Sequence, residues 1–230
     1  TVYATDLPPL AAPVGGSSPQ GLYVELLRLV ERDTGHRFIW SFQPWARAQL
    51  STQADPRGLI VNLTRNEERE PRYRWIAPIG WGQYAVYVLR DHPATRARDL
   101  GMQSIGYLNG ADAATILGEE GLPNAEPASS GVANARKLRA GRISGWAVNI
   151  WTGASIYEEA GLDPRELRAL PFGKPWIQWL AGAPQFPEIA AQDIAGALKK
   201  LKDDGSIKAL EVRFAPAAAG AAVTGRTGER

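Results

Sequence analysis

The apolar positions in the first part of the chain alternate between short runs and one helical face. Residues 22–30 place apolar side chains at the spacing of one helix face, and Gly35 ends the run. Residues 58–63 form a short apolar run bounded by turn residues, which is typical of a buried parallel strand. The pattern predicts strands over residues 2–4, 37–42 and 58–63, helices over 22–35 and 45–54, and a loop over 15–19. This β-α-β-α-β order is that of a doubly wound lobe.

A second series of the same kind follows. Residues 73–79 and 83–90 are strand-like and are separated by Gly80, Trp81 and Gly82, where we expect the chain to leave the first lobe. Further strands are predicted over 103–108, 143–148 and 176–183, and helices over 111–117, 132–140, 152–160, 189–202 and 206–214. Residues 215–230 are rich in Ala and Gly and predict a loose tail.

The bulk properties exclude several classes of function. The 230 residues carry a formal net charge of only +2, and basic and acidic residues are interleaved, which argues against a nucleic-acid partner. The absence of Cys excludes disulfides, thiolate metal sites and a Cys nucleophile, and it fits an oxidising compartment. No apolar run reaches the roughly 18 residues of a membrane span, and a signal peptide, if the protein is exported, has been removed.

Several patches in consistent order resemble one protein family. Residues 63–69 (Leu-Thr-Arg-Asn-Glu-Glu-Arg), followed by 73–79, resemble the family-3 extracellular solute-binding proteins of ABC importers, which bind polar amino acids. Four further patches agree with this family over about residues 3–214: 21–27, 44–48, 141–146 and 201–207.

The resemblance implies an α/β chain with the type II periplasmic-binding-protein fold, in which two doubly wound lobes are joined by a two-segment hinge. We expect residues 1–82 and 184–230 to form lobe 1 and residues 83–183 to form lobe 2, with a cleft between them. The implied function is periplasmic capture of a small carboxylate-bearing ligand, an amino acid or amino-acid-like solute, by hinge closure. The implied partner is an ABC-importer membrane permease, and the implied binder is a monomer, not an enzyme, with no cofactor or metal.

Arg69 is the strongest candidate ligand residue. The resemblance places it where the family grips the ligand's carboxylate, and a guanidinium can pair with a carboxylate in two parallel hydrogen bonds. The alternative is a surface Arg that pairs with Glu67, Glu68 or Glu70.

Four more candidates belong to lobe 1. Asn62 and Thr64 leave the end of a predicted buried strand, and the alternative is that they bond only to their own backbone. Asp6 matches a family Asp near the ligand, or it caps a turn before Pro8. Trp45 offers a ring face to the ligand, or it is a core aromatic at the start of a helix.

Lobe 2 supplies the remaining candidates. Gly110, Ala111 and Asp112 match a family turn whose backbone N–H groups meet the ligand's carboxylate, although Asp112 can also serve as a helix N-cap. Asn149 stands where the family has an Asp that holds the ligand's α-ammonium. A neutral amide loses that charge pairing, so the substitution argues against an ordinary α-amino acid ligand.

Two other classes of function stay open. The same fold hosts periplasmic dehydratases of cyclohexadienyl acids, which need an acid or base; His36 and His92 are more simply surface residues, and Asp112 is the candidate carboxylate. The fold can also be the sensing domain of a receptor such as a histidine kinase. No membrane-spanning segment follows Phe214, which argues against this reading unless the chain is a fragment.

Overall fold

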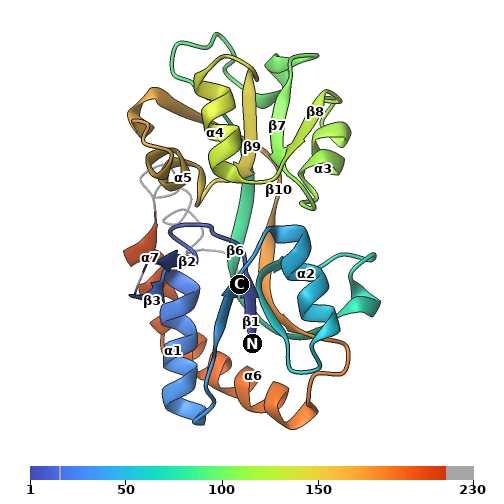
Figure 1. Cartoon of the computed structure of the whole chain (residues 1–230), viewed down its shortest axis with the longest axis vertical. Coiled ribbons are helices and arrows are strands. Elements are labelled where there is room, and N and C mark those ends of the chain that lie inside the picture. The colour runs from blue at the N-terminus through green and yellow to red at the C-terminus, as the bar shows by residue number, and fades with distance from the viewer. Residues whose placement is uncertain (16, 216–230) are drawn as a thin grey trace. The chain divides into compact units, whose positions relative to one another are not determined.

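The structure, a computed structural model, describes residues 1–15 and 17–215. The chain divides into two compact units, of which one comprises Thr1–Trp81 with Trp176–Ala215 and the other comprises Gly82–Pro175 (Figure 1). The sequence placed the second boundary after residue 183, but residues 178–182 pair with a strand of the first unit and so belong there. The predicted tail, apart from residue 215, lies outside the described residues.

The first unit is built on three parallel strands. β1 (Val2–Ala4) lies between β4 (Trp40–Phe42) and β5 (Leu59–Thr64), and Val2 pairs with both neighbours. On its other side, β5 pairs in antiparallel fashion with β10 (Leu167–Gly182), which is itself next to β6 (Arg74–Leu89). Polar residues that follow β1, β4 and β5 therefore leave the same edge of the parallel strands.

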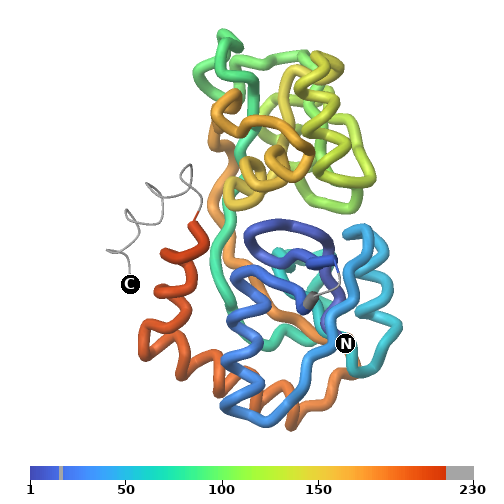
Figure 2. The backbone as a smooth tube through the Cα atoms, turned by 60° about the vertical axis from the view of Figure 1, so that its left-hand side comes forward, coloured from blue at the N-terminus to red at the C-terminus, as the bar shows by residue number. Residues whose placement is uncertain are grey.

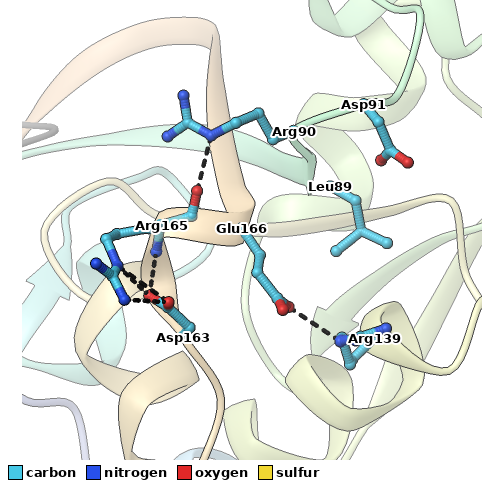
Figure 3. Close-up of a pocket in the computed structure, with 7 residues that line it drawn as sticks. All are labelled: Leu89, Arg90, Asp91, Arg139, Asp163, Arg165 and Glu166. Atoms are coloured by element: carbon cyan, nitrogen blue, oxygen red, sulfur yellow. Dashed lines mark hydrogen bonds and ion pairs between the residues drawn. The ribbon is translucent and has the colours of Figure 1, made fainter.

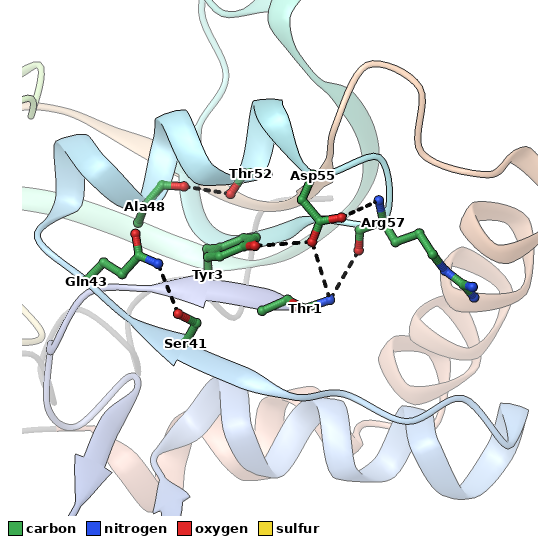
Figure 4. A network of polar contacts seen from close by, with 8 residues as sticks. All are labelled: Thr1, Tyr3, Ser41, Gln43, Ala48, Thr52, Asp55 and Arg57. Carbon is green, nitrogen blue, oxygen red and sulfur yellow. Dashed lines mark hydrogen bonds and ion pairs between the residues drawn. The ribbon is translucent and has the colours of Figure 1, made fainter.

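Helices cover both sides of these strands. α2 (Trp45–Ala54) packs on one side, and α1 (Leu22–Thr34) and α6 (Glu188–Asp203) lie on the other (Figure 4). α1 also contacts α7 (Ser206–Phe214), so the last two helices are held against the first (Figure 2). The predicted apolar face of α1 is confirmed as buried, and Gly35 ends the helix with a φ of 75°.

The second unit repeats the parallel core on a smaller scale. β7 (Ile105–Leu108) pairs in parallel with β8 (Ala125–Ala128) and β9 (Gly145–Asn149), and β9 pairs in antiparallel fashion with β6. α4 (Gly131–Arg139) packs on all three parallel strands and on α5 (Gly153–Glu159), while α3 (Ala113–Glu119) contacts β7. Single 3₁₀ turns occur at Glu70–Arg72, Ala97–Leu100 and Pro164–Glu166.

The structure differs from the predicted elements at several places, and β10 begins at Leu167 where the sequence predicted a strand only from residue 176. β6 is one strand and is not broken at Gly80 and Gly82, neither of which has a positive φ. β8 and a hairpin of β2 (Ala12–Val14) and β3 (Ser17–Gln20) were not predicted, because they are short and contain Pro. Among the described residues, no helix combines the length and apolar composition that a membrane crossing requires.

Candidate functional site

β5 contains a bulge where its polar residues begin. Leu63 pairs with Trp179 but Ile60 pairs with Ala181, so two residues of β5 lie opposite one residue of β10. One of the two is Asn62, whose φ of 62° is the single positive value for a non-glycine among the described residues. Such a backbone costs about 1 kcal/mol or more and persists only where its surroundings enforce it. A bulge re-aims the side chains that follow it, so Asn62 fixes how the chain leaves the strand.

A buried chain of polar side chains holds Asn62 in this conformation. The Nε2 of Gln178 on β10 donates to Asn62 Oδ1, and the Gln178 Oε1 accepts from the Tyr23 hydroxyl on α1. Gln178 and Tyr23 are each only 1% exposed. Because an unsatisfied buried polar group costs about 1–3 kcal/mol, each member of the chain requires its neighbours.

Glu211 of α7 stands at the far end of this chain. A Cβ at Gly80 would lie 3.4 Å from Tyr23 Oη, 3.5 Å from Gln178 Oε1 and 3.7 Å from Glu211 Oε1. The missing side chain at position 80 thus leaves room for three polar groups. Burial raises the pKa of Glu211, and burial together with the Glu211 carboxylate raises the pKa of Tyr23 well above its ordinary value.

Arg69 follows β5 and is buried, with 8% of its surface exposed. Its Nη1 donates to the Thr64 carbonyl oxygen at 3.1 Å, and its backbone N–H donates to Asn66 Oδ1 at 3.0 Å. Among the described residues, no carboxylate forms an ion pair with it: Glu70 pairs with Arg65, and Glu68 with Arg72. The alternative of an exposed Arg paired with Glu68 or Glu70 therefore does not describe this residue. A buried charge without a counter-charge is costly, and an anionic ligand is a natural partner for it.

Arg65 has a different role in the same segment. Its guanidinium lies 5.3 Å from the ring centre of Trp75 on β6 and 5.0 Å from that of Trp179 on β10, and it binds both carboxylate oxygens of Glu70. This cation–π contact attaches the segment that carries Arg69 to the two long strands.

Asp6 and Trp45 follow β1 and β4, at the same edge of the parallel strands as Thr64. Asp6 is exposed, whereas Trp45 is 6% exposed, as expected of a core aromatic at a helix start. The Tyr3 hydroxyl donates to Asp55 Oδ2 at 3.2 Å and so attaches β1 to the end of α2 (Figure 4). The ligand roles of Asp6 and Trp45 stay predictions.

In the second unit, Asn149 ends β9 and is 7% exposed. Its Oδ1 accepts from the Trp151 backbone N–H at 3.1 Å, and its Nδ2 is buried without a hydrogen-bond acceptor among the described residues. The side chain therefore keeps an unused donor, whereas the Asp that the family has at this place offers only acceptors.

The turn 110–112 follows β7, the strand next to β9. Gly110 has a φ of 80°, and the Ala111 N–H donates to the Leu108 carbonyl at 3.0 Å. Asp112 occupies the N-cap position of α3, but its side chain makes no capping bond; instead its Oδ1 accepts from the Tyr84 hydroxyl at 2.7 Å. Asp112 therefore stands at the N-cap position, as the alternative proposed, but its carboxylate does not cap the helix.

Other charged groups of the second unit gather elsewhere. An open cavity of about 520 Å³ is lined by Arg90, Asp91, Arg139, Asp163, Arg165 and Glu166 together with Leu89 (Figure 3). No predicted site residue lines it, and Arg139–Glu166 and Arg165–Asp163 are already ion pairs. His36 lies 3.5 Å from Asp193 and His92 lies 3.1 Å from Gln103, so neither is near the candidates above. Within the part of the chain that the structure describes, no three metal-binding side chains cluster.

Known structures share the whole architecture. A histidine-kinase sensor domain with similarity to periplasmic binding proteins superimposes with a TM-score of 0.81 at 18% identity, covering 93% of this chain and 94% of the other. The chain has the type II periplasmic-binding-protein fold. No protein-family model and no curated protein sequence matches it.

Two further neighbours share this fold. The substrate-binding protein of an ABC uptake transporter from Streptococcus pneumoniae, with bound histidine, has a TM-score of 0.80 at 14% identity, covering 93% of this chain and 91% of its own. An ancestral amino-acid-binding protein, a precursor of cyclohexadienyl dehydratase, has a TM-score of 0.79 at 16% identity, covering 94% of both chains. At these identities the likeness establishes the fold alone.

Sequence reasoning missed two residues of this binding-protein fold that the structure places beside the candidates. Gln178 is the single polar residue in the apolar run 176–181, a signal that the sequence does carry. Tyr84 pairs in register with Asn149, and only strand pairing reveals that proximity.

We expect Gln178→Leu to lower the free energy of unfolding by about 2–4 kcal/mol, because it leaves Tyr23 and Asn62 without partners. Chemical denaturation measures this change. Gln192→Leu, on the exposed side of α6, is the matched control and should change stability by less than about 0.5 kcal/mol. Equal effects of the two substitutions would show that the buried chain does not matter.

The raised pKa of Glu211 predicts a pH dependence of stability. The folded protein holds the Glu211 proton more tightly than the unfolded chain, so stability is lost as pH rises above the ordinary value of 4.5. Glu211→Gln should therefore raise the melting temperature at about pH 7 more than at about pH 4. Thermal unfolding of the variant, with the exposed Glu159→Gln as control, measures this difference, and an equal shift at both pH values would contradict it.

Proposed function

We propose that this protein is a periplasmic solute-binding protein that captures a small carboxylate-bearing ligand, an amino acid or amino-acid-like solute, for an ABC importer. The fold supports a solute-binding role, since amino-acid-binding proteins of ABC transporters share it. The membrane permease of that importer is the proposed partner, and the protein acts as a monomer.

The observation that carries the proposal is the buried guanidinium of Arg69, which forms no ion pair with a described residue. Its hydrogen bond to the Thr64 carbonyl uses one of five N–H donors, and no other side-chain bond of Arg69 occurs in the part of the chain that the structure describes. A ligand carboxylate can take two of the others in parallel and supply the missing negative charge. Asn62 and Thr64 belong to the same site, since they end the strand from which Arg69 follows.

The proposed response to the ligand is hinge closure. β6 and β10 are the two segments that pass from one unit to the other, and bending of these strands is the proposed motion. A ligand shifts such an equilibrium only by its difference in affinity for the open and closed states. We therefore assign ligand contacts to Asp6, Trp45, Asn62, Thr64 and Arg69 in one unit and to Gly110, Ala111, Asp112 and Asn149 in the other.

Arg69→Ala should weaken binding of a carboxylate ligand by at least about tenfold, because a charge-assisted pair is lost. Thermal-shift screening of amino acids, dicarboxylates, opines and aromatic acids finds the ligand, and calorimetry then measures its affinity for wild type, Arg69→Ala and Arg69→Lys. Arg72→Ala, an exposed Arg of the same segment paired with Glu68, is the matched control and should bind as the wild type does.

A further variant, Arg69→Met, tests whether the guanidinium serves binding or folding. Without ligand, Arg69→Met should lower the free energy of unfolding by less than about 1 kcal/mol, since it removes an uncompensated buried charge. Unchanged affinity in Arg69→Ala would remove Arg69 from the site and would refute the proposal.

Turnover separates binding from catalysis. The purified protein, incubated with prephenate or arogenate, should bind or ignore these acids without forming product. Product formation that Asp112→Asn abolishes would instead make the protein a dehydratase, the reading that the ancestral neighbour leaves open.

A further inference from the structure

The side-chain amide of Asn149 has a fixed orientation, and only one of its two polar atoms has a hydrogen-bond partner among the described residues. The Trp151 backbone N–H can donate only to the amide oxygen, so this bond decides which arm of the Asn149 side chain is Oδ1. The other arm is Nδ2, a buried donor with no acceptor among the described residues. A buried donor is almost always paired in a native protein, so the missing acceptor asks for an explanation.

The position of Asn149 points to a ligand as that acceptor. β9 and its neighbour β7 are parallel, and Asn149 is the last residue of β9. In open α/β sheets, ligands bind beyond the carboxyl ends of such strands. Asn149 therefore belongs to the edge of the second unit at which a ligand is expected.

The groups around Asn149 define what the acceptor can be. Tyr84 lies opposite Asn149 in the β6–β9 register, so both side chains lie on one face. The Tyr84 ring stacks on Phe172 with centroids 5.6 Å apart, and its hydroxyl bonds to Asp112. The surroundings thus combine two rings, an unpaired amide donor and a carboxylate that already holds one donor.

These surroundings disfavour both an ammonium and a second anion at Asn149. An ammonium group has donors only and cannot bond to Nδ2. A ligand carboxylate at this position would add a second negative charge to the surroundings of Tyr84, whose hydroxyl already bonds to the carboxylate of Asp112. A neutral carbonyl oxygen accepts from Nδ2 without either penalty.

Building on the proposed function, we propose that Asn149 selects carboxylate ligands in which a carbonyl group replaces the free α-ammonium, as in 2-oxo acids and N-acylated amino acids. Asn149 Nδ2 donates to the carbonyl oxygen of such a ligand. Asn149 is then the residue that separates these ligands from free amino acids of the same side chain.

The test compares triads of ligands that share a side chain: the free amino acid, its 2-oxo acid and its N-acetyl derivative. Calorimetry on the wild type should show that one carbonyl form binds at least about tenfold more tightly than the free amino acid. Comparison of the 2-oxo acid with the N-acetyl derivative shows whether the site prefers a keto or an amide carbonyl. Asn149→Asp keeps an oxygen for the Trp151 N–H and turns the donor arm into an acceptor, so it should reverse the preference.

Asn124→Asp is the matched control. Asn124 is exposed and directly precedes β8, at the opposite edge of the parallel strands, so the same change of charge there should leave every ratio unaltered. A wild-type preference for the carbonyl form below about tenfold, or one that Asn149→Asp does not reduce, overturns this inference.

Arg69→Ala tests the proposed function independently of the inference about Asn149. If Arg69→Ala weakens the best ligand while the Asn149→Asp ratios stay as in wild type, the proposed function stands and this inference fails. If Arg69→Ala has no effect, or if no carboxylate of any triad binds, both fail.

Discussion

A guanidinium can be buried only if something compensates its charge, and this constraint organises the first unit. Arg69 donates a hydrogen bond to the backbone carbonyl of Thr64, and it forms no ion pair with a carboxylate among the described residues. The geometry of Thr64 in turn depends on the bulge at Asn62, which Gln178 and Tyr23 hold through buried hydrogen bonds. A binding side chain needs a rigid support, because conformational entropy that the support loses on binding lowers the affinity.

That support reaches elements far apart in the sequence. The polar chain joins β5 to β10 and α1, and Arg65 attaches the segment after β5 to β6 and β10 through two Trp rings. Of the two long strands, β10 thus bonds directly to the candidate residue Asn62, and β6 contacts the neighbouring Arg65. A binder that signals its occupancy by bending these strands would profit from such contacts, and this is how the proposed hinge closure connects to the site.

The two units offer a ligand different chemistry. The first presents a guanidinium that forms no ion pair among the described residues, and the second has an amide donor without an acceptor among them and a carboxylate that accepts from a tyrosine. The fold alone does not choose between transport, sensing and catalysis, because its neighbours include a sensor domain, a transporter's binding protein and the precursor of a dehydratase. Function therefore depends on side chains, and the proposed ligand selectivity rests on the amide donor of Asn149.

The sequence alone determined the fold class and most elements. Helical spacing predicted α1, and α2 and α7 begin and end at the predicted residues, because local pattern and turn residues decide where such elements start. The resemblance singled out Arg69, and its local motif places it five residues after the end of β5. Only the tertiary structure showed that its charge is buried without an ion pair among the described residues, since burial depends on strands distant in sequence. Likewise, the bulge at Asn62, the neighbours of Gln178 and the direction of the Asn149 amide follow from strand register and long-range hydrogen bonds, which no local pattern records.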